Sequence, residues 1–350
     1  MVARPARLTP PLQCVPLRDP ESDLEGVIVI HSTALGPGAG GCRFWSYPDM
    51  DRAQADAMRL AEGMSYKNAL AGLPLGGAKA VLRKPEGAFD RTRLFRAFGR
   101  AVEELGGRYV TAEDVGTSVA DMQEVAKATR HVAGLPPAEG RAGGDPSPWT
   151  ALGVFESMRE AAAFALGSEL SGLTVAVQGT GNVGADLCRH LAEAGARLVI
   201  ADPDPRRREE LRAALGARVV DVNEIAEVEA DVFAPCALGG VLNRESVGKL
   251  RVRLVCGAAN NQLASPDVGA MLLDRGIAYV PDYVANAGGI ISVSAEYLGE
   301  TETDVAQRVA TIAPRVAEIL ERAAHENRSP AAVADEMAEE VIARAQRAAA

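Results

Sequence analysis

Two lysines have the residue type and the surroundings to do chemistry. The chain contains 5 lysines against 32 arginines, yet three of the lysines fall within residues 67–84. Lys67 and Lys79 lie there in an apolar, glycine-rich stretch. Arginine keeps its proton in proteins, whereas a buried lysine can titrate near neutrality. The pattern favours an amine that gives up a proton, and the alternative is a chance placement in an arginine-rich composition.

A predicted helix over residues 51–68 must carry Lys67. Apolar positions in this segment recur at steps of four and three, which is typical of one helical face. The predicted stripe consists of Ala53, Ala57, Leu60, Met64 and Lys67. We therefore expect Lys67 to extend an apolar face, with its amine either reaching solvent or lying in a lined cavity.

Lys79 and Asp114 are each placed next to a predicted strand. A glycine-rich bend, Gly72–Gly77, leads to Lys79 and to a strand that continues from Ala80. Asp114 follows a predicted strand at 108–112 and precedes a predicted helix at 118–129. A carboxylate there suits proton transfer, but Asp114 is equally compatible with the N-cap of that helix.

A dinucleotide-binding fingerprint lies in the second half of the chain. It consists of Gly179, Thr180, Gly181, Asn182, Val183 and Gly184. A predicted strand at 173–178 precedes it and a predicted helix at 182–194 follows, which is the context that the fingerprint requires. Glycines there let a pyrophosphate approach the helix N-terminus.

An acidic residue at the end of the next strand predicts the cofactor. Asp202 follows the strand at 197–201, and a carboxylate in this place accepts hydrogen bonds from the ribose of NAD and repels the extra phosphate of NADP. Arg206, Arg207 and Arg208 leave an alternative open, since they either bind that phosphate or form a solvated helix face. Asn261 also follows a predicted strand, and it either contacts cofactor and substrate or forms a turn.

The composition excludes several classes of function. The net charge of −10 argues against a nucleic-acid-binding or membrane-binding surface. The five cysteines are far apart in sequence, which predicts neither a disulfide framework nor a metal site. No apolar leader or membrane-spanning run is evident, so we expect a cytoplasmic protein that acts on small molecules.

The length and the pattern of elements predict an α/β protein of two domains. A substrate-binding domain is expected over 1–137, a linker over 138–149, and a doubly wound, Rossmann-type NAD-binding domain over 150–302. The segment 303–350 is expected to form helices that pack back on the first domain.

Six segments together resemble the glutamate/leucine/phenylalanine/valine dehydrogenases, and most of all the leucine and valine branch. In order along the chain they are Leu35–Arg43, Gly63–Asn68, Gly72–Lys79, Thr111–Thr117, Ala234–Gly240 and Pro281–Gly289. The resemblance implies a substrate domain and a Rossmann-type domain with a cleft between them. It also implies a homo-oligomer that interconverts an L-amino acid with its 2-oxo acid and ammonia, using NAD.

The resemblance also implies roles for individual residues. Lys67 would pair with the substrate carboxylate, Lys79 would activate water near the α-carbon, and Asp114 would carry the proton to and from the amine. Further implied substrate-site residues are Ala39, Gly40, Gly41, Met64, Asn261, Ile290 and Val293, and further cofactor-site residues are Thr150 and Ala237.

The side chain of the substrate is predicted to be apolar. Ala39 occupies the place where the glutamate branch carries a lysine, so a second substrate carboxylate would be buried without a partner. Ile290 and Val293 favour a branched aliphatic substrate, while the small Ala39 leaves phenylalanine as an alternative. Two other readings are a non-catalytic sensor on this scaffold and a Schiff-base enzyme using Lys79. Ala78, in place of a usual glycine, is expected to tighten the backbone near Lys79.

Overall fold

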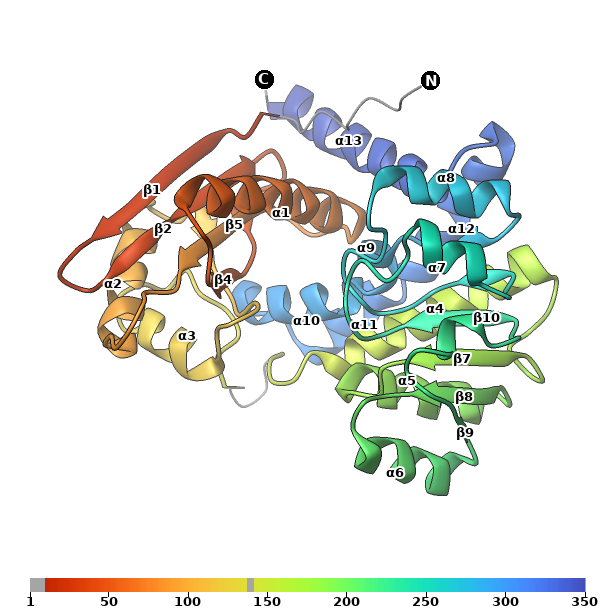
Figure 1. Cartoon of the computed structure of the whole chain (residues 1–350). Coiled ribbons are helices and arrows are strands. Elements are labelled where there is room, and N and C mark those ends of the chain that lie inside the picture. Colours follow the sequence, from red (N-terminus) through yellow and green to blue (C-terminus); the bar gives the residue numbers. More distant parts are fainter. Residues whose placement is uncertain (1–9, 137–141, 350) are drawn as a thin grey trace. The chain divides into compact units, whose positions relative to one another are not determined.

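The computed structural model describes residues 10–136 and 142–349 (Figure 1). It divides into two compact units. Within those residues the first unit, here called the amino-terminal unit, comprises 10–136, 142–144, Ser292–Val305 and 338–349. The second, here called the parallel-sheet unit, comprises Asp145–Ile291 and Ala306–Met337. Of the predicted linker, residues 138–141 lie outside the described residues, and a helix already begins at Ser147.

A mixed sheet forms the frame of the amino-terminal unit. Its strands run in the order β1-β2-β5-β3-β6, and β4 also pairs with β5. The hairpin β1–β2 and the pair β2–β5 are antiparallel, whereas β3 and β4 run parallel to β5. The strands are β1 (Gln13–Asp19), β2 (Leu24–Ser32), β3 (Gly38–Ala39), β4 (Cys42–Trp45), β5 (Gly76–Arg83) and β6 (Tyr109–Val110).

Helix α1 (Met50–Leu70) covers one face of this sheet. A cluster of small and β-branched side chains joins the two: Val27, Val29 and Val81 from the strands, and Ala53, Ala57 and Ala61 from α1. Because alanines leave little side chain between helix and sheet, the helix backbone lies close to β5.

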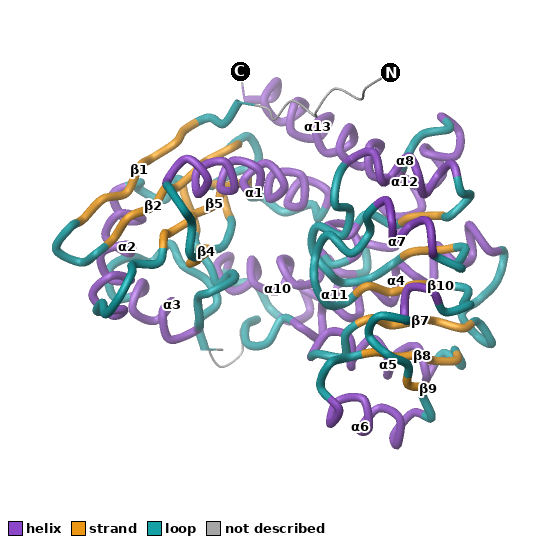
Figure 2. The backbone as a smooth tube through the Cα atoms, viewed as in Figure 1, coloured by secondary structure: helices purple, strands orange, loops and turns teal. Residues whose placement is uncertain are grey.

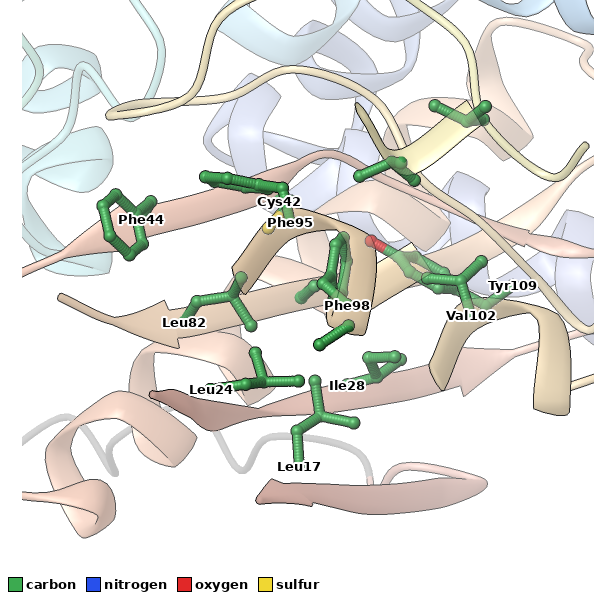
Figure 3. Packing of buried hydrophobic residues seen from close by; sticks show 14 of the residues in the cluster. Leu17, Leu24, Ile28, Cys42, Phe44, Leu82, Phe95, Phe98, Val102 and Tyr109 are labelled. Atoms are coloured by element: carbon green, nitrogen blue, oxygen red, sulfur yellow. The ribbon is translucent and has the colours of Figure 1, made fainter. Parts of the chain in front are cut away.

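The opposite face of the sheet packs on α2 (Arg91–Glu104) and α3 (Val119–Ala126). Figure 3 shows this larger core, in which Phe95 and Phe98 of α2 lie against Ile28 and Leu82 of the strands. Side chains alternate across a strand, so odd positions of β5 face α1 and even positions face this core. The same alternation places Cys42 and Phe44 of β4 in the core and turns Arg43 toward α1.

The glycine pair that opens β5 is required by close packing. A Cβ atom at Gly76 would lie 2.0 Å from the carbonyl oxygen of Ser32, and one at Gly77 would lie 2.1 Å from the backbone nitrogen of Ser65 in α1. Ala78 is accommodated because Gly38 opposite it has no side chain; a Cβ at Gly38 would lie 2.9 Å from that of Ala78. The expected crowding at Ala78 is thus relieved by Gly38.

The second unit is built on a six-stranded, all-parallel sheet of order β12-β11-β10-β7-β8-β9. Figure 2 labels β10, β7, β8 and β9 of this sheet. Its strands are β7 (Thr174–Gln178), β8 (Arg197–Ala201), β9 (Arg218–Val219), β10 (Val232–Pro235), β11 (Leu254–Val255) and β12 (Ala278–Tyr279). This arrangement confirms the predicted Rossmann-like fold class.

Helices flank both faces of the parallel sheet. Helices α4 (Ser147–Leu166) and α5 (Asn182–Glu193) pack together and lie beside β7, β8 and β11, and α6 (Pro205–Leu215) contacts α5 and β8. The other face packs on the 3-10 turn η1 (Ile225–Glu227), α7 (Arg244–Lys249) and α8 (Pro266–Asp274). The remaining helices are α9 (Asp282–Ala285), α10 (Ala287–Leu298), α11 (Glu302–Val309), α12 (Ile312–Glu326) and α13 (Pro330–Ala349).

The C-terminal helices correct one expectation. Helix α12 packs against α4 and α9 within the parallel-sheet unit, rather than on the first domain. Only the later part of α13, from Ala338, belongs with the amino-terminal unit. There Glu339 accepts a hydrogen bond from the Tyr66 hydroxyl at 2.8 Å. None of the helices in the described residues is long and apolar enough to cross a membrane.

Two glycine-to-alanine substitutions should test the close packing of α1. We expect Gly77→Ala to lower the free energy of unfolding by about 1–3 kcal/mol, because its Cβ must push α1 away from β5. Gly63 lies in α1 itself. Gly63→Ala should leave the free energy of unfolding unchanged or raise it slightly, since no atom lies within 4 Å of its Cβ position.

The two tryptophans allow the amino-terminal unit to be followed separately. Trp45 lies in β4 and Trp149 in α4, so in a Trp149→Phe background the remaining fluorescence reports on the unit that contains both glycines. Equal denaturation midpoints for the two alanine variants would contradict the packing argument.

Candidate active site

An ion pair between Lys79 and Asp114 lies at the centre of the amino-terminal unit's polar site. Lys79 lies in β5, on the side of the sheet that α1 covers, and its side chain is 6% exposed. Its Nζ lies 3.1 Å from Oδ2 of Asp114, in the loop after β6. The two residues, 35 positions apart in sequence, therefore meet as an acid–base pair.

The protonation of both groups is set by burial and by each other. Burial lowers the pKa of the Lys79 amine below its usual value, and Asp114 offsets this only in part. Burial raises the pKa of the Asp114 carboxyl, but Lys79 and Arg43 outweigh it and hold that pKa below its usual range. The site thus combines a carboxylate that stays ionised with an amine that gives up its proton more readily than a solvated lysine.

The loop that carries Asp114 is fixed by its own hydrogen bonds. The backbone N–H of Asp114 donates to the Thr117 hydroxyl at 2.8 Å, and that hydroxyl lies 3.1 Å from the carbonyl of Cys42. The N-cap of α3 is Ser118, which forms a capping box with Asp121. Asp114 is therefore not the N-cap, and this alternative from the sequence is wrong.

Gly40 and Gly41 pack closely against the backbone that carries the ion pair. A Cβ at Gly40 would lie 1.9 Å from the carbonyl oxygen of Ala78 and 3.1 Å from Cγ of Met64. A Cβ at Gly41 would lie 3.0 Å from that of Asp114. Any side chain at either position would thus displace the backbone that presents Lys79 and Asp114.

Ala39 and Met64 line the same region, and Lys67 lies one turn beyond Met64 on α1. Ala39 is buried, and its carbonyl accepts a hydrogen bond from the buried Asn68 amide at 3.5 Å. The predicted apolar stripe needs correction: the buried face of α1 continues from its alanines through Ser65 and Asn68. Leu60, Met64 and Lys67 are only half-buried, so Lys67 lies beside that stripe rather than on it.

Three polar residues were not anticipated from the sequence. The guanidinium of Arg43 donates to Asp114 at 2.9 Å and to Asp56 of α1 at 3.0 Å. Asp56 in turn accepts a hydrogen bond from the Tyr47 hydroxyl at 2.6 Å. The available signal was an arginine between Cys42 and Phe44, since strand alternation turns that side chain away from the core that buries its neighbours.

The glycine-rich loop of the parallel-sheet unit has the shape that a dinucleotide requires. Gly179 has a φ of +93°, and a Cβ at Gly184 would lie 2.0 Å from the carbonyl oxygen of Gly179. Gly181 is the N-cap of α5, and the nearest atom to its Cβ position is Nη1 of Arg207, at 3.7 Å. The first and third glycines close the turn, while the second leaves room above the helix N-terminus for a pyrophosphate.

Asp202 lies at the end of β8 beside this loop. Its carboxylate accepts hydrogen bonds from the backbone N–H of Thr180 at 2.7 Å and of Asp204 at 2.8 Å. Burial raises the pKa of the Asp202 carboxyl, but these backbone donors outweigh it and keep the pKa below its usual value. A negative charge is therefore maintained where the cofactor ribose is expected.

The other expected cofactor residues are distributed around the parallel-sheet unit. Asn182 and Val183 begin α5, and Ala237 packs against Gly179, whose Cβ position lies 2.8 Å from the Ala237 methyl. Thr150 of α4 donates to the carbonyl of Pro146 and approaches Gly289. Asn261 is exposed with a φ of +54°, and its carbonyl accepts from the N–H of Gly240. This geometry fits the turn-forming alternative for Asn261, whose backbone contacts the 239–240 loop.

The expected pocket residues Ile290 and Val293 lie one turn apart on α10. The Ala-Gly-Gly segment directly before them is already helical, because α10 begins at Ala287. A Cβ at Gly288 would lie 1.9 Å from the carbonyl oxygen of Trp149, so this glycine serves close helix packing. Among the described residues, no group of three metal-ligating side chains is assembled.

Comparison with known proteins places these features in one family. Residues 13–131 match the model described as Glu/Leu/Phe/Val dehydrogenase, dimerisation domain. Residues 207–349 match the model described as Glutamate/Leucine/Phenylalanine/Valine dehydrogenase. Residues 174–236 also match a model described as NADP oxidoreductase, coenzyme F420-dependent.

Similar proteins cover nearly the whole chain. Leucine dehydrogenase of Geobacillus stearothermophilus is 45% identical over 326 residues, which are 93% of this chain and 89% of that protein. Valine dehydrogenase of Streptomyces albus is 46% identical over 342 residues, 95% and 93% of the two chains. The crystal structure of L-tryptophan dehydrogenase from Nostoc punctiforme superposes with a TM-score of 0.86 at 38% identity, covering 96% of each chain. The chain therefore belongs to the glutamate/leucine/phenylalanine/valine dehydrogenase family and is an amino-acid dehydrogenase.

Proposed function

We propose that this enzyme catalyses the reversible, NAD-dependent oxidative deamination of an apolar, branched-chain L-amino acid to its 2-oxo acid and ammonia. The observation that carries the proposal is the buried Lys79–Asp114 pair, with its 3.1 Å separation. An amine that can lose its proton next to a carboxylate that stays ionised suits a reaction that moves protons at both water and nitrogen.

We assign a separate role in the reaction to each of three residues of the site. Lys67 binds the substrate carboxylate, which fixes the α-carbon near Lys79. NAD, when bound, accepts the hydride that leaves the α-carbon. Asp114 takes up a proton from the substrate ammonium group before the hydride leaves, and it returns that proton to the nitrogen as the carbon–nitrogen bond breaks. Lys79 removes a proton from the water that attacks the resulting imino carbon. The products are a 2-oxo acid, ammonia and a proton, and the steps run in reverse for amination.

The preference for NAD rests on Asp202. Its ionised carboxylate lies beside the glycine-rich loop and would repel a 2′-phosphate. Arg207 is the opposing influence, because its guanidinium approaches Gly181 and its charge acts on Asp202. Arg207 already has an acidic neighbour, Asp204, at 3.7 Å. We propose that the balance favours NAD.

The preference for a branched aliphatic side chain rests on apolar groups. Ala39 and Met64 lie by the catalytic pair and offer no cation to a second carboxylate, and Ile290 and Val293 are apolar as well. The leucine and valine dehydrogenases among the relatives fit this selection. Phenylalanine is the second candidate, because Ala39 is small, and the similarity to a tryptophan dehydrogenase structure favours testing aromatic substrates too.

The assembly and location of the enzyme complete the proposal. The matching segment 13–131 carries the description dimerisation domain, which supports a homo-oligomer. We propose that the homo-oligomer works in the cytoplasm on free amino acids, in keeping with the acidic composition of the chain.

Substitution of the two lysines should separate binding from catalysis. We expect Lys79→Arg to reduce kcat by about 100-fold or more, because a guanidinium cannot give up a proton at working pH. Lys67→Arg should instead raise KM for the amino acid roughly tenfold and change kcat little. Steady-state kinetics at saturating NAD measure both, and NADH binding serves as the control for folding.

The pH profile should carry the signature of Lys79. Because burial lowers the pKa of this amine, kcat/KM for deamination should rise with pH through a group below the ordinary lysine value of about 10.4. Near-wild-type kcat in Lys79→Arg would show that charge alone suffices and would end the argument for a titrating amine.

Substrate selection should depend on Ala39. We expect wild-type kcat/KM to be highest for branched aliphatic amino acids in a panel that includes phenylalanine, tryptophan and glutamate. Ala39→Lys should raise the ratio of glutamate to leucine kcat/KM at least about tenfold, since it pairs a buried carboxylate. Ala39→Leu adds bulk without charge and should leave glutamate poor. Highest wild-type activity on glutamate would contradict the pocket assignment.

Cofactor choice should depend on Asp202 and Arg207. We expect wild-type enzyme to bind NADH more tightly than NADPH, and Asp202→Ala to narrow this difference by about tenfold because the repelling charge is gone. Adding Arg207→Ala to Asp202→Ala should weaken NADPH binding again. Fluorescence titration with each reduced cofactor measures the affinities without turnover. Equal use of NAD and NADP by the wild type would show that the arginines bind the phosphate.

A further inference from the structure

Arg43 connects the proposed acid–base pair to helix α1. It leaves β4 on the α1 side of the sheet, between Cys42 and Phe44, which are both fully buried in the opposite core. Because its two neighbours are fixed there, the direction of the arginine is fixed as well. Its side chain is 19% exposed, so both of its carboxylate partners are largely screened from water.

The guanidinium of Arg43 spans two carboxylates. Nε donates to Oδ2 of Asp114 at 2.9 Å, and Nη1 donates to Oδ2 of Asp56 at 3.0 Å. Asp56 is held in turn by the Tyr47 hydroxyl on the same oxygen and by Arg59 on its other oxygen, at 2.8 Å. The guanidinium uses two separate nitrogens, each aimed at one of the two carboxylates, whereas a lysine would have to reach both from a single nitrogen.

Two cations meet one oxygen of Asp114. Nζ of Lys79 and Nε of Arg43 both contact Oδ2, at 3.1 and 2.9 Å. Within the described residues, no hydrogen bond to Oδ1 of Asp114 is found, and the side chain is 22% exposed. The carboxylate is thus anchored through one oxygen while the other is available to a substrate.

We propose, building on the function proposed above, that Arg43 is a positioning residue of the reaction. It holds Asp114 so that Oδ1 faces the substrate amine, and its permanent charge disfavours a second positive charge on Lys79. Asp56 and Tyr47 keep Arg43 in place from the α1 side.

The charged and titratable groups around Lys79 determine in which direction its pKa changes when Arg43 is removed. They are Asp114 from the loop after β6, Arg43 and the Cys42 thiol from β4, and Asp56 of α1 behind Arg43. Burial is the main cause of the low pKa of Lys79, Asp114 raises that pKa, and Arg43 lowers it. Removal of Arg43 should therefore raise the pKa of Lys79 and move the alkaline rise in activity to higher pH.

The test compares Arg43→Gln, Arg43→Lys and a matched control, Arg59→Gln. Arg59 also contacts Asp56, but on the oxygen that Arg43 does not use. We expect Arg43→Gln to lower kcat at least about tenfold and to move the rise in kcat/KM upward by about one pH unit, with KM changed less than kcat. Arg43→Lys should restore the pH profile in part but not kcat, because a single amine nitrogen cannot reproduce the two separate donor positions that the guanidinium offers to Asp114 and Asp56. Arg59→Gln should match the wild type.

A measurement without turnover supplies the second readout. The rate of acetylation of Lys79 by acetic anhydride, followed by peptide mass spectrometry over a range of pH, reports its titration, with the exposed Lys127 as internal reference. Arg43→Gln should shift the Lys79 curve to higher pH and leave the Lys127 curve in place. NADH binding and circular dichroism check that each variant is folded.

The outcomes separate this inference from the proposed function. Wild-type enzyme that reduces no NAD with any amino acid would overturn the proposed function. Active wild type, together with an Arg43→Gln variant whose kcat, pH profile and Lys79 acetylation curve are unchanged, would overturn the role of Arg43 alone. A loss of kcat with an unmoved pH profile and acetylation curve would limit Arg43 to a structural contact and would also overturn the inference.

Discussion

One carboxylate oxygen, Oδ2 of Asp114, imposes the tightest constraint on the amino-terminal unit. Two cations contact it in a largely buried place, and burying three charges together is favourable only when their geometry is fixed. The three side chains come from β5, β4 and the loop after β6. The short parallel strands, the glycines at 40 and 41 and the close seat of α1 on β5 all serve to bring those segments together.

The sequence was most informative where periodicity and glycine chemistry agree. The strand at 197–201 was predicted with the boundaries that the structure has, because an apolar run marks it clearly. Strands of two to four residues, such as β3 and β4, carry too few positions for any period to emerge. The role of Arg43 was not predicted for the same reason. The face of the sheet on which its side chain lies can be inferred only once β4 is known to be a strand.

Where the predictions were wrong, packing distance decided the outcome. The predicted stripe on α1 began correctly with Ala53 and Ala57. It then continued through the larger Leu60, whereas a helix packed directly on a sheet buries the small Ala61 instead. Packing distance also accounts for Gly288, because the absence of a side chain there lets α10 approach the backbone of α4. The unit on which α12 packs depends on long-range contacts that no local pattern encodes. The meeting of Lys79 and Asp114 was likewise implied by family resemblance, not by spacing.

Strand β5 has a consequence for how the enzyme loses activity. It is hydrogen-bonded to β2, β3 and β4 and is covered by helices on both faces, so it has the features of the slowest-exchanging segment of its unit. The amine of Lys79, to which we assign the proton transfer, is thus attached to the strand that these contacts predict to open least often. Local unfolding at the surface of the unit should leave Lys79 in place. Activity that depends on Lys79 should therefore be lost only when the whole sheet unfolds cooperatively.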